Sequence, residues 1–383
     1  MSEIHALTSL REEEQFFHDT VRDFARERVL PLREQMDREG HVDDKLMRSL
    51  WEMGLMGIEI PEAYGGAGGS FFMSCLAIEA MSTVDAAVAV VVDVQNTLVI
   101  NALLRWASED IKQRYLPLLS EKWLGAYALS EAGSGSDAFA LSCRAEEQGG
   151  DFILNGQKLW ITNAGEADLF IVFANINPAA GHKGITAFLV ERSFEGFSVG
   201  KKEDKLGIRA SSTCELVLKD CRVPRANVLG EVGVGYKVAI ETLNEGRIGI
   251  GAQMVGLTQG CLDYTKNYLS ERKQFGKALA SFQGVQFQFA QAAAELDAAR
   301  LCVYNAARLR ETGRPFVREA AVAKLIASQM AQRNTSLCLD LLGGYGFVKE
   351  YPVEKYFRDA KIGTIYEGTT NMQLMTIAKL ALG

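Results

Sequence analysis

The chain has 383 residues, of which 48% are apolar and 23% charged, and its formal net charge is −7. This composition is ordinary for a globular protein, and the length predicts two or three domains. The excess of negative charge argues against a nucleic-acid-binding protein and against attachment to an anionic membrane surface.

The strongest apolar run, residues 86–92, is too short to cross a bilayer, so we expect no membrane segment. Residues 1–5 lack the basic region and the apolar core of a signal peptide, so we expect no leader. The seven cysteines are scattered and form no Cys-x-x-Cys pair. This pattern predicts reduced thiols in a reducing compartment rather than a disulfide framework.

The four histidines are His5, His18, His41 and His182. None stands at metal-ligand spacing from cysteines or carboxylates, so we expect no zinc or iron site. Only His182 lies outside the N-terminal helical region, which argues against a Ser-His-Asp or Cys-His nucleophile. If the chain is an enzyme, we expect a carboxylate base and an organic cofactor that carries the difficult chemistry.

Residues 1–124 have the pattern of an N-terminal helical domain. Apolar residues recur at near-helical spacing over 10–29, and helical periodicity returns over 71–106. Between these segments, the run 61–69 is rich in proline and glycine and predicts a loop.

Residues 125–233 change to β-type patterns and predict a small antiparallel sandwich or barrel. Residues 151–162 form two β-rich runs around Asn155-Gly156, which predicts a hairpin with its turn at that pair. Further short strands are expected at 169–174, 184–190 and 215–218.

Residues 234–383 are helical again and predict a C-terminal bundle. No proline occurs between Pro224 and Pro315, and an apolar stripe at 3-to-4 spacing runs through Phe289, Ala293, Leu296, Ala299, Val303 and Ala306. Five glycines lie in the helical run 246–260, where each costs roughly 1 kcal/mol against alanine. Close helix packing and a ligand lying against the backbone explain them equally well.

The most informative segment is 366–371, Tyr-Glu-Gly-Thr-Thr-Asn, which precedes an apolar helical run. It places the carboxylate of Glu367 at a helix N-terminus, where unpaired N–H groups and the helix dipole favour bound phosphate. The alternative is that Thr370 or Asn371 caps the helix and Glu367 is a solvated loop residue.

Four other segments suit a ligand, and each also has a purely structural interpretation. The small residues of 129–137 permit N–H groups to face an anion, or form a plain turn. Residues 160–162, Trp-Ile-Thr, place an aromatic ring beside a hydroxyl, or contribute a core tryptophan. Segments 271–284, with Arg272 and Phe275, and 340–347, with paired glycines, offer phosphate contacts or ordinary helix ends.

Taken together and in this order, the segments resemble the acyl-CoA dehydrogenase family, a family of flavoproteins, over essentially the whole chain. The resemblance rests on residues 61–68, 129–137, 160–162, 206–213, 271–276, 340–346 and 366–368. Segments 243–250 and 355–362 are most similar to the short/branched-chain (2-methyl-branched) type.

The resemblance implies an α+β fold with an N-terminal helical domain (1–124), a central antiparallel β domain (125–233) and a C-terminal four-helix bundle (234–383). It implies that FAD is held between the β domain and the C-terminal bundle. It also implies that the protein is a homotetramer, arranged as a dimer of dimers. On the β domain, the implied flavin contacts are Tyr127, Leu129, Ser130, Gly135, Ser136, Trp160, Ile161 and Thr162. The contacts implied from the bundle, most of them to the FAD of a neighbouring subunit, are Arg272, Phe275, Gln283, Asp340, Leu341, Leu342, Gly343, Gly344, Thr369 and Asn371.

The resemblance also implies a mechanism. Glu367 would remove the α-proton of an acyl thioester while hydride leaves the β-carbon for flavin N5, giving a trans-2-enoyl-CoA. Some family members carry the base just before the arginine equivalent to Arg247, but here that position is Gly246, so we expect Glu367 to act. The implied substrate contacts are Ser136, His182, Tyr236, Asn244, Glu245, Arg247 and Gly368, although the most similar family members have a tyrosine at position 182.

Several points stay open from the sequence. The resemblance implies an electron-transfer flavoprotein as electron acceptor, but an oxidase that uses oxygen and a non-catalytic acyl-CoA-binding protein are alternatives. Straight, 2-methyl-branched and small cyclic acyl groups all remain candidates for the substrate. The leaderless start favours a bacterial cytoplasm, or the mitochondrial matrix if the chain is processed. No metal, nucleic acid or membrane partner is expected.

Overall fold

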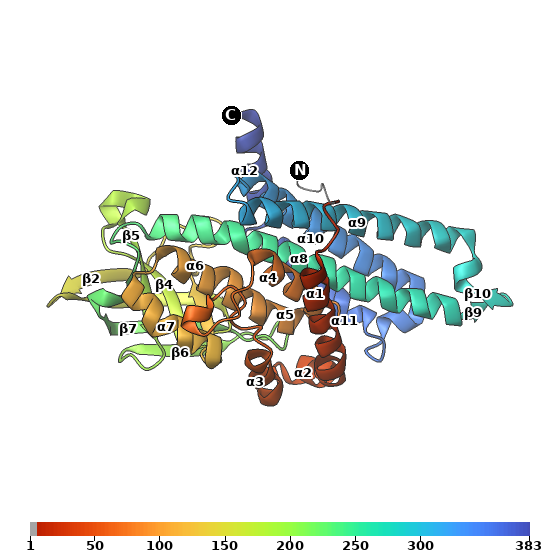
Figure 1. Ribbon diagram of the computed structural model, residues 1–383, viewed down its shortest axis with the longest axis horizontal. Coiled ribbons are helices and arrows are strands. Elements are labelled where there is room, and N and C mark those ends of the chain that lie inside the picture. The colour runs from red at the N-terminus through yellow and green to blue at the C-terminus, as the bar shows by residue number, and fades with distance from the viewer. Residues whose placement is uncertain (1–5) are drawn as a thin grey trace.

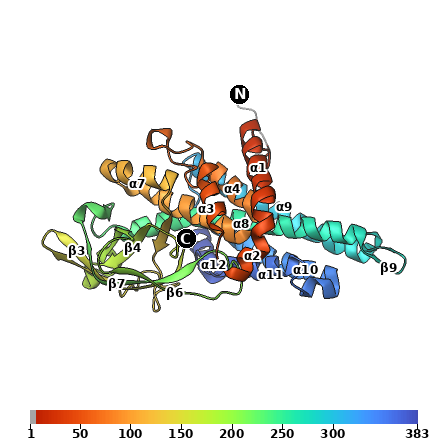
Figure 2. The same cartoon turned by 90° about the horizontal axis from the view of Figure 1, so that it is seen from below.

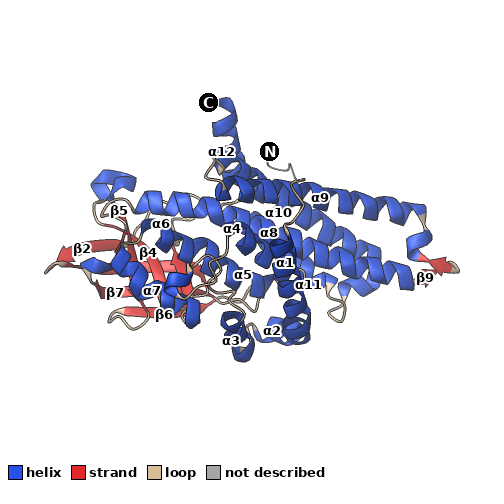
Figure 3. Ribbon diagram, viewed as in Figure 1, coloured by secondary structure: helices blue, strands red, loops and turns tan. Residues whose placement is uncertain are grey.

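The computed structural model describes residues 6–383. The expectation of no leader concerns residues 1–5 and, like His5, lies outside the described residues. The described chain is elongated, with a sheet at one end and long helices reaching to the other (Figures 1 and 3). The predicted α+β fold class is confirmed, while the domain boundaries at 124 and 233 stay a prediction.

The N-terminal part is helical, as predicted. Its α-helices are α1 (Glu12–Phe24), α2 (Arg33–Glu39), α3 (Asp44–Glu52), α4 (Phe71–Ser82), α5 (Ala86–Asp93), α6 (Asn101–Trp106) and α7 (Glu109–Glu121). The predicted helical run over 71–106 breaks once, before α5. There α4 ends at Ser82, and the carboxylate of Asp85 accepts a hydrogen bond from the N–H of Ala87 (2.7 Å) as the N-cap of α5.

From α5 the helix continues through a π-helical segment, η4 (Val94–Ile100), into α6. In the described residues this is one helix, Ala86–Trp106, that is long and apolar enough to cross a membrane by length and composition, with a mean hydropathy of 1.8. The expectation that no apolar run reaches that length is therefore wrong. However, 94% of the apolar window is buried inside the fold, so its side chains contact other elements of the protein.

The central part forms one eight-stranded sheet. Its strands are β1 (Gly125–Ala128), β2 (Arg144–Gln148), β3 (Asp151–Thr162), β4 (Leu169–Asn175), β5 (Ile185–Glu191), β6 (Phe197–Lys202), β7 (Thr213–Val223) and β8 (Val228–Leu229). The order is β6-β7-β3-β2-β4-β5-β8, with β1 beside β4. The strands predicted at 169–174, 184–190 and 215–218 are present. The sheet is mixed rather than purely antiparallel, because β1 pairs with β4 in parallel and β2 also has a parallel bridge to β4.

The hairpin predicted at Asn155-Gly156 is wrong. Residues 151–162 form one long strand, β3, which pairs with β7 and shows a register shift between Leu154 and Gly156. Gly156 is needed there for space, because a Cβ would lie 2.8 Å from Cys143. The turn falls earlier, at Gly149 and Gly150, where both glycines have positive φ angles (64° and 91°) and connect β2 to β3.

The C-terminal part is a helical bundle. Its long helices are α8 (Gly235–Glu271), α9 (Gln283–Glu311) and α10 (Val317–Leu342), and the shorter α11 (Val353–Ala360) and α12 (Thr370–Leu382) complete it. A small ribbon, β9 (Lys273–Gln274) with β10 (Lys277–Ala278), lies at the far tip (Figures 1 and 2). Helix α12 projects from the body of the molecule in Figure 1.

The glycines of α8 answer the question that the sequence left open, and mainly in favour of close packing. A Cβ at Gly256 would lie 2.0 Å from the carbonyl oxygen of Glu79, and one at Gly260 would lie 1.9 Å from that of Thr83. Helix α4 and its C-terminal turn therefore touch the backbone of α8 at these positions. Nearer the sheet, Gly246 and Gly249 instead make room for carboxylate side chains.

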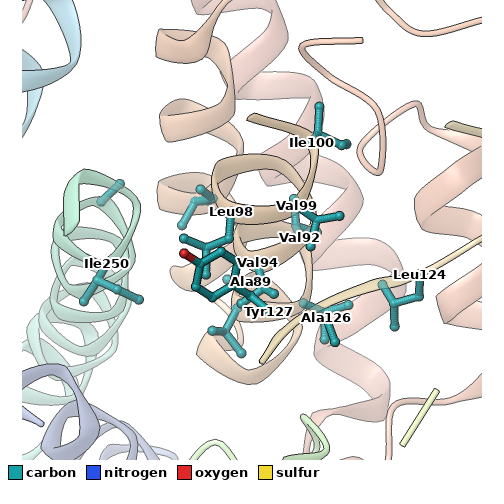
Figure 4. Packing of buried hydrophobic residues seen from close by; sticks show 14 of the residues in the cluster. Ala89, Val92, Val94, Leu98, Val99, Ile100, Leu124, Ala126, Tyr127 and Ile250 are labelled. Carbon is teal, nitrogen blue, oxygen red and sulfur yellow. The ribbon is translucent and has the colours of Figure 1, made fainter. Parts of the chain in front are cut away.

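The core continues without interruption from β1 through η4 to α8. Figure 4 shows the ring of Tyr127 against Val94 and Leu98, with its hydroxyl turned toward α8. That hydroxyl lies 3.5 Å from the carbonyl oxygen of Ala239 on α8. The contact between β1, η4 and α8 positions the candidate active site.

Candidate active site

Glu367 lies in a tight turn that leads into α12. Glu367 and Gly368 both have positive φ angles, 53° and 87°, and a non-glycine residue in this region is strained by about 1 kcal/mol or more. Two buried side chains hold the turn. Gln373 donates to the carbonyl oxygens of Glu367 (3.2 Å) and Gly368 (2.8 Å), and Nζ of Lys324 donates to that of Gly368 (2.6 Å).

The carboxylate of Glu367 points into the protein rather than into bulk solvent. A Cβ at Gly246 would lie 2.8 Å from its Oε2 and equally close to Cδ2 of Leu98. Oε2 is buried and has no hydrogen-bond partner within residues 6–383. The alternative of a solvated loop residue is therefore wrong. The cap of α12 is provided by Thr369, whose side chain accepts from the N–H of Met372 (3.4 Å), and not by Thr370 or Asn371.

Burial raises the pKa of Glu367 to about 7, and the positive charges of Lys324 and Arg247 limit that rise. Near neutral pH the group can therefore both accept and hold a proton. A pKa close to the working pH is the property that makes a carboxylate an effective general base.

A second buried carboxyl group, that of Asp93, lies against Gly249 of α8 and close enough to feel the charge of Glu367. Asp93 is buried, its Oδ1 accepts from the hydroxyl of Thr97 (2.8 Å), and a Cβ at Gly249 would overlap it. Burial raises the pKa of Asp93 well above its ordinary value, and the charge of Glu367 adds to the rise. Tyr366, next to the base, donates from its hydroxyl to Gln253 of α8.

Glu367→Gln is expected to stabilise the protein at alkaline pH. The pKa of Glu367 lies above that of an unfolded glutamate, so the wild-type stability is fully present below about pH 4.5 and falls as pH rises through 7. The upper limit of the gain for the variant is about 3 kcal/mol at pH 8, since one pKa unit corresponds to about 1.4 kcal/mol. Urea unfolding of both proteins at pH 5 and pH 8 measures it, and an equal difference at both pH values would contradict the argument.

On the β domain, the predicted flavin contacts cluster at one end of β3. The loop 129–136 is attached to this strand because the N–H of Leu159 donates to the carbonyl oxygen of Ser130 (2.9 Å). A buried ion pair between Glu131 and Lys158 (2.7 Å) fixes the same loop, and Nζ of Lys158 also donates to the carbonyl oxygen of Leu129 (3.2 Å). Ser130 is thereby held beside Leu159, the residue before Trp160, and Thr162 lies two residues after Trp160 on the same strand.

Trp160 is the most unusual residue of this cluster. Its side chain is 56% exposed, and its φ angle is +59°, a region that a tryptophan rarely adopts. A flat ring that is held in a strained, exposed position suits contact with another flat group. Gly135, in the neighbouring loop, has no atom of the described chain within 4 Å of its Cβ position, so the space beside it is open.

Four predicted cofactor contacts have side chains that are buried in the protein's own core: Tyr127, Leu129, Ile161 and Leu342. These residues can offer a ligand main-chain groups but little side-chain surface. β1 is buried along its whole length, Ile161 is on the buried face of β3, and Leu342 is among the buried residues of α10.

Thr369 and Asn371 lie at the start of α12, directly after Glu367. The other cofactor contacts lie at the far end of the bundle. Arg272 follows α8 and its guanidinium lies 5.2 Å from the ring centre of Tyr345, beside the open glycines Gly343 and Gly344. Phe275 is 94% exposed, and Gln283, which begins α9, is exposed as well. Helix α8 separates this set from the β-domain set by about 55 Å of its length. One chain therefore does not bring the two halves together.

The predicted substrate contacts fall into two groups, one at the N-terminal end of α8 and one beside Glu367. His182 and Tyr236 pack edge to face with ring centres 4.7 Å apart, at the N-terminal end of α8. Farther along α8, Nη1 of Arg247 donates to Oδ1 of Asn244 (2.9 Å), and Nε of Arg247 is buried without a partner in the described residues. Burial lowers the pKa of Arg247, and the charge of Glu367 opposes that effect.

The prediction for Glu245 is not supported by its contacts. Its carboxylate is buried and pairs with Arg105 of α6 (2.5 Å) and Arg310 of α9 (2.9 Å). The neighbouring residue on α8, Gly246, faces Glu367, and adjacent helical positions differ in direction by about 100°. Glu245 therefore joins helices to one another and is not among the side chains around the base.

The sequence did not reveal the buried residues that support the turn of Glu367 and the loop 129–136. Lys324 and Gln373 support the turn of Glu367, Lys158 anchors the loop 129–136, and Asp93 lies below the base. A charged residue inside an apolar helical face was the signal available for Lys324 and Asp93. Nothing in the sequence pairs Lys158 with Glu131, because their contact depends on how the loop folds back onto β3.

Other kinds of site find no support in the described part of the chain. Among residues 6–383, no three His, Cys, Asp or Glu side chains are grouped to hold a metal ion. All seven cysteines are free thiols, and six of them are buried. Two surface hollows, one lined by Arg11–Glu13 and Phe16 and one between Glu39 and Arg209, share no residue with the cluster around Glu367.

Comparison with known proteins agrees with this geometry. Three domain models of one family match the chain in order: "Acyl-CoA dehydrogenase, N-terminal domain" at 11–122, "middle domain" at 126–221 and "C-terminal domain" at 233–382. The chain belongs to the acyl-CoA dehydrogenase family. It is an oxidoreductase, and FAD is the cofactor of this family.

Two relatives are short/branched-chain enzymes by name. The chain is 55% identical to "Probable short/branched chain specific acyl-CoA dehydrogenase" of Dictyostelium discoideum over 98% of this chain and 91% of the relative. It is 52% identical to the mitochondrial "Short/branched chain specific acyl-CoA dehydrogenase" of Rattus norvegicus over 97% of this chain and 86% of the relative. Relatives of the family occur both in mitochondria and in bacteria.

Two solved structures have the same fold. Butyryl-CoA dehydrogenase of Megasphaera elsdenii is 40% identical with a TM-score of 0.96, over 98% of this chain and 99% of that one. A glutaryl-CoA dehydrogenase of Mycobacterium smegmatis, described in complex with FADH2, is 30% identical with a TM-score of 0.92, over 97% and 95%.

The residues of this acyl-CoA dehydrogenase fit FAD. The exposed, strained ring of Trp160 suits contact with a flavin, and the open backbone at Gly135 leaves room for its edge. At the far end of the bundle, Arg272 and the uncovered glycines Gly343 and Gly344 suit a pyrophosphate.

Proposed function

We propose that the enzyme dehydrogenates a short or 2-methyl-branched acyl-CoA to the trans-2-enoyl-CoA, with Glu367 as the base. The observation that carries the proposal is the position of Glu367. Its carboxylate is enclosed against Gly246 and Leu98, and its Oε2 has no hydrogen-bond partner among the described residues. Burial raises its pKa to about 7. The names of the two relatives support the short/branched-chain substrate class.

In the proposed reaction the α-carbon loses a proton and the β-carbon loses a hydride, and the electron pair of the α C–H bond forms the new double bond. Oε2 of Glu367 accepts the proton, and the strained turn holds that oxygen in place. The hydride passes to the flavin, which is the chemistry that FAD supplies when bound. Main-chain N–H donors near Glu367 would stabilise the enolate oxygen as negative charge develops there, typically by a few kcal/mol.

We propose that acyl-CoA lies along α8 between His182 and Glu367. Ser136, Tyr236, Asn244, Arg247 and Gly368 are the remaining contacts, and the packing of His182 on Tyr236 supports a path at the N-terminal end of the helix. Glu245 is left out, since its carboxylate is committed to two arginines.

We further propose that each FAD is shared between subunits of a homotetramer. The separation of the Arg272–Gly344 set from the Trp160 set along α8 supports this assignment. Large apolar side chains are uncovered at the far end of the bundle, with Phe275 94% and Phe347 88% exposed. Exposure on this scale is typical of a surface that another chain covers.

The proposed electron acceptor is an electron-transfer flavoprotein, and the proposed compartment is a bacterial cytoplasm, or the mitochondrial matrix for a processed chain. The occurrence of relatives in mitochondria and bacteria supports both compartments. The seven free thiols are consistent with the reducing conditions of either.

Anaerobic titration of the purified yellow protein with butyryl-, isobutyryl- and 2-methylbutyryl-CoA tests the function. We expect bleaching of the flavin band, most completely with the branched substrate, because the chain is 55% identical to a short/branched-chain relative. Absence of bleaching by all three would contradict the proposal. Rapid reoxidation in air-saturated buffer would favour the oxidase alternative, and a colourless protein would favour the non-catalytic one.

A further inference from the structure

Lys324 is a fully buried lysine whose local contact does not account for its charge. It lies on α10, and its Nζ donates to the carbonyl oxygen of Gly368 at 2.6 Å. Within residues 6–383 this neutral carbonyl is its one hydrogen-bond acceptor, and no carboxylate lies within 4 Å. An uncharged donor could hold the same carbonyl without the cost of burying an ammonium group.

The charged groups around Lys324 show where its charge acts. Glu367 and Arg247 are the two groups whose charges affect Lys324, and burial lowers its pKa to about 8. In return, Lys324 is the strongest charge acting on the pKa of Glu367, ahead of Arg247. Glu367 also faces the buried Asp93 of α5 and the hydroxyls of Tyr127 on β1 and Tyr366 in its own turn.

We propose that Lys324 is a positioning residue that sets the protonation of the base. Through its hydrogen bond to Gly368 it fixes the strained turn of Glu367, and through its charge it favours the ionised carboxylate. This inference rests on the proposed function of Glu367. The two roles are separable, because glutamine at position 324 retains a donor but no charge, whereas arginine retains the charge.

The test measures the rate constant of flavin reduction by 2-methylbutyryl-CoA between pH 5.5 and 9 in anaerobic stopped flow. In the wild type the rate rises with pH as Glu367 ionises, with a midpoint near its pKa of about 7. In Lys324→Gln and Lys324→Met the midpoint should move up by about one unit, the usual effect of losing a nearby opposite charge. In Lys324→Arg it should stay close to the wild-type value.

A second readout needs no substrate. Infrared titration follows the carboxylic-acid band that disappears in Glu367→Gln, and this band should show the same upward shift in the two neutral variants. Thr335→Val is the matched control, because Thr335 is also buried on α10 but its hydroxyl donates only to carbonyl oxygens of its own helix, those of Ala331 (2.7 Å) and Gln332 (3.4 Å). It should leave the midpoint unchanged.

An unshifted midpoint in both neutral variants would overturn the inference, even if the rate falls equally at every pH. Failure of both neutral variants to fold, while Thr335→Val folds, would likewise count against it, since Lys324 would then be a structural residue. A wild type that no acyl-CoA bleaches would instead refute the proposed function, and the infrared titration would still decide the role of Lys324.

Discussion

Replacing Glu367 with glutamine is expected to leave a folded, yellow protein that acyl-CoA no longer bleaches. Glutamine keeps the volume of the side chain in the space beside Gly246 and Leu98, but it cannot accept the α-proton. Loss of a general base typically lowers a rate by about 10²- to 10⁴-fold. Anaerobic stopped flow with 2-methylbutyryl-CoA measures the loss, and the visible spectrum reports whether FAD is retained.

Glu350→Gln is a suitable control for this experiment, because Glu350 is an exposed carboxylate on the segment between α10 and α11. It should be bleached at the wild-type rate. If Glu367→Gln were bleached at nearly that rate too, another group would have to be the base. Asp93, the other buried carboxyl group near the turn, would be the first candidate.

Lys158→Met is expected to destabilise the protein by about 3 kcal/mol or more and to weaken FAD binding. Breaking a buried pair on one side leaves an uncompensated charge, which typically costs about 3–5 kcal/mol. The remaining Glu131 would still accept hydrogen bonds from Ser142 (2.6 Å) and Cys143 (3.2 Å), which places the effect at the lower end of that range. Urea unfolding and the bound-flavin absorbance measure both effects.

The pH dependence gives this prediction a direction. Despite burial, Lys158 and the hydroxyl of Ser142 hold the pKa of Glu131 below its ordinary value, so the pair stabilises the fold above about pH 4.5 and less as pH falls. The loss in Lys158→Met should therefore shrink in acid. The double variant Glu131→Gln/Lys158→Met should recover part of the stability.

The exposed Lys201, which pairs with Glu203 at the surface, is the control, and Lys201→Met should not move the unfolding midpoint. Equal effects at positions 158 and 201 would contradict the argument.

Local patterns in the sequence predict much of the fold, and the family resemblance adds Glu367 as the expected base. The spacing of apolar residues predicts the helical ends of the chain, and alternating patterns predict β4, β5 and β7, because periodicity follows directly from which face is buried. Glu367 stands out because its motif is contiguous. The Asn155-Gly156 hairpin fails because the partner strand β7 extends past that pair and continues the ladder, an interaction that no local pattern contains.

The supporting residues of the site are harder to predict, since they come together only in three dimensions. Lys324 reaches Gly368 across 44 residues of chain, and Lys158 reaches Glu131 across 27. Both lysines are isolated charges in otherwise ordinary helix and strand patterns. Their roles depend on which turn or loop lies against them, so a sequence can mark them as unusual but cannot name their partners.

Helix α8 carries proposed substrate contacts near its first turns and ends just before proposed cofactor contacts, and a single rigid rod joins the two sets. Removing one residue between Gly251 and Gly256 would rotate the distal end by about 100° and retract it by about 1.5 Å. Point substitutions can accumulate at the exposed positions of this rod, but insertions and deletions cannot be absorbed by any loop within it. The length of α8 therefore fixes the distance between the two sets of contacts. We expect this length to be invariant in functional descendants of this gene, even where the sequence of the helix changes.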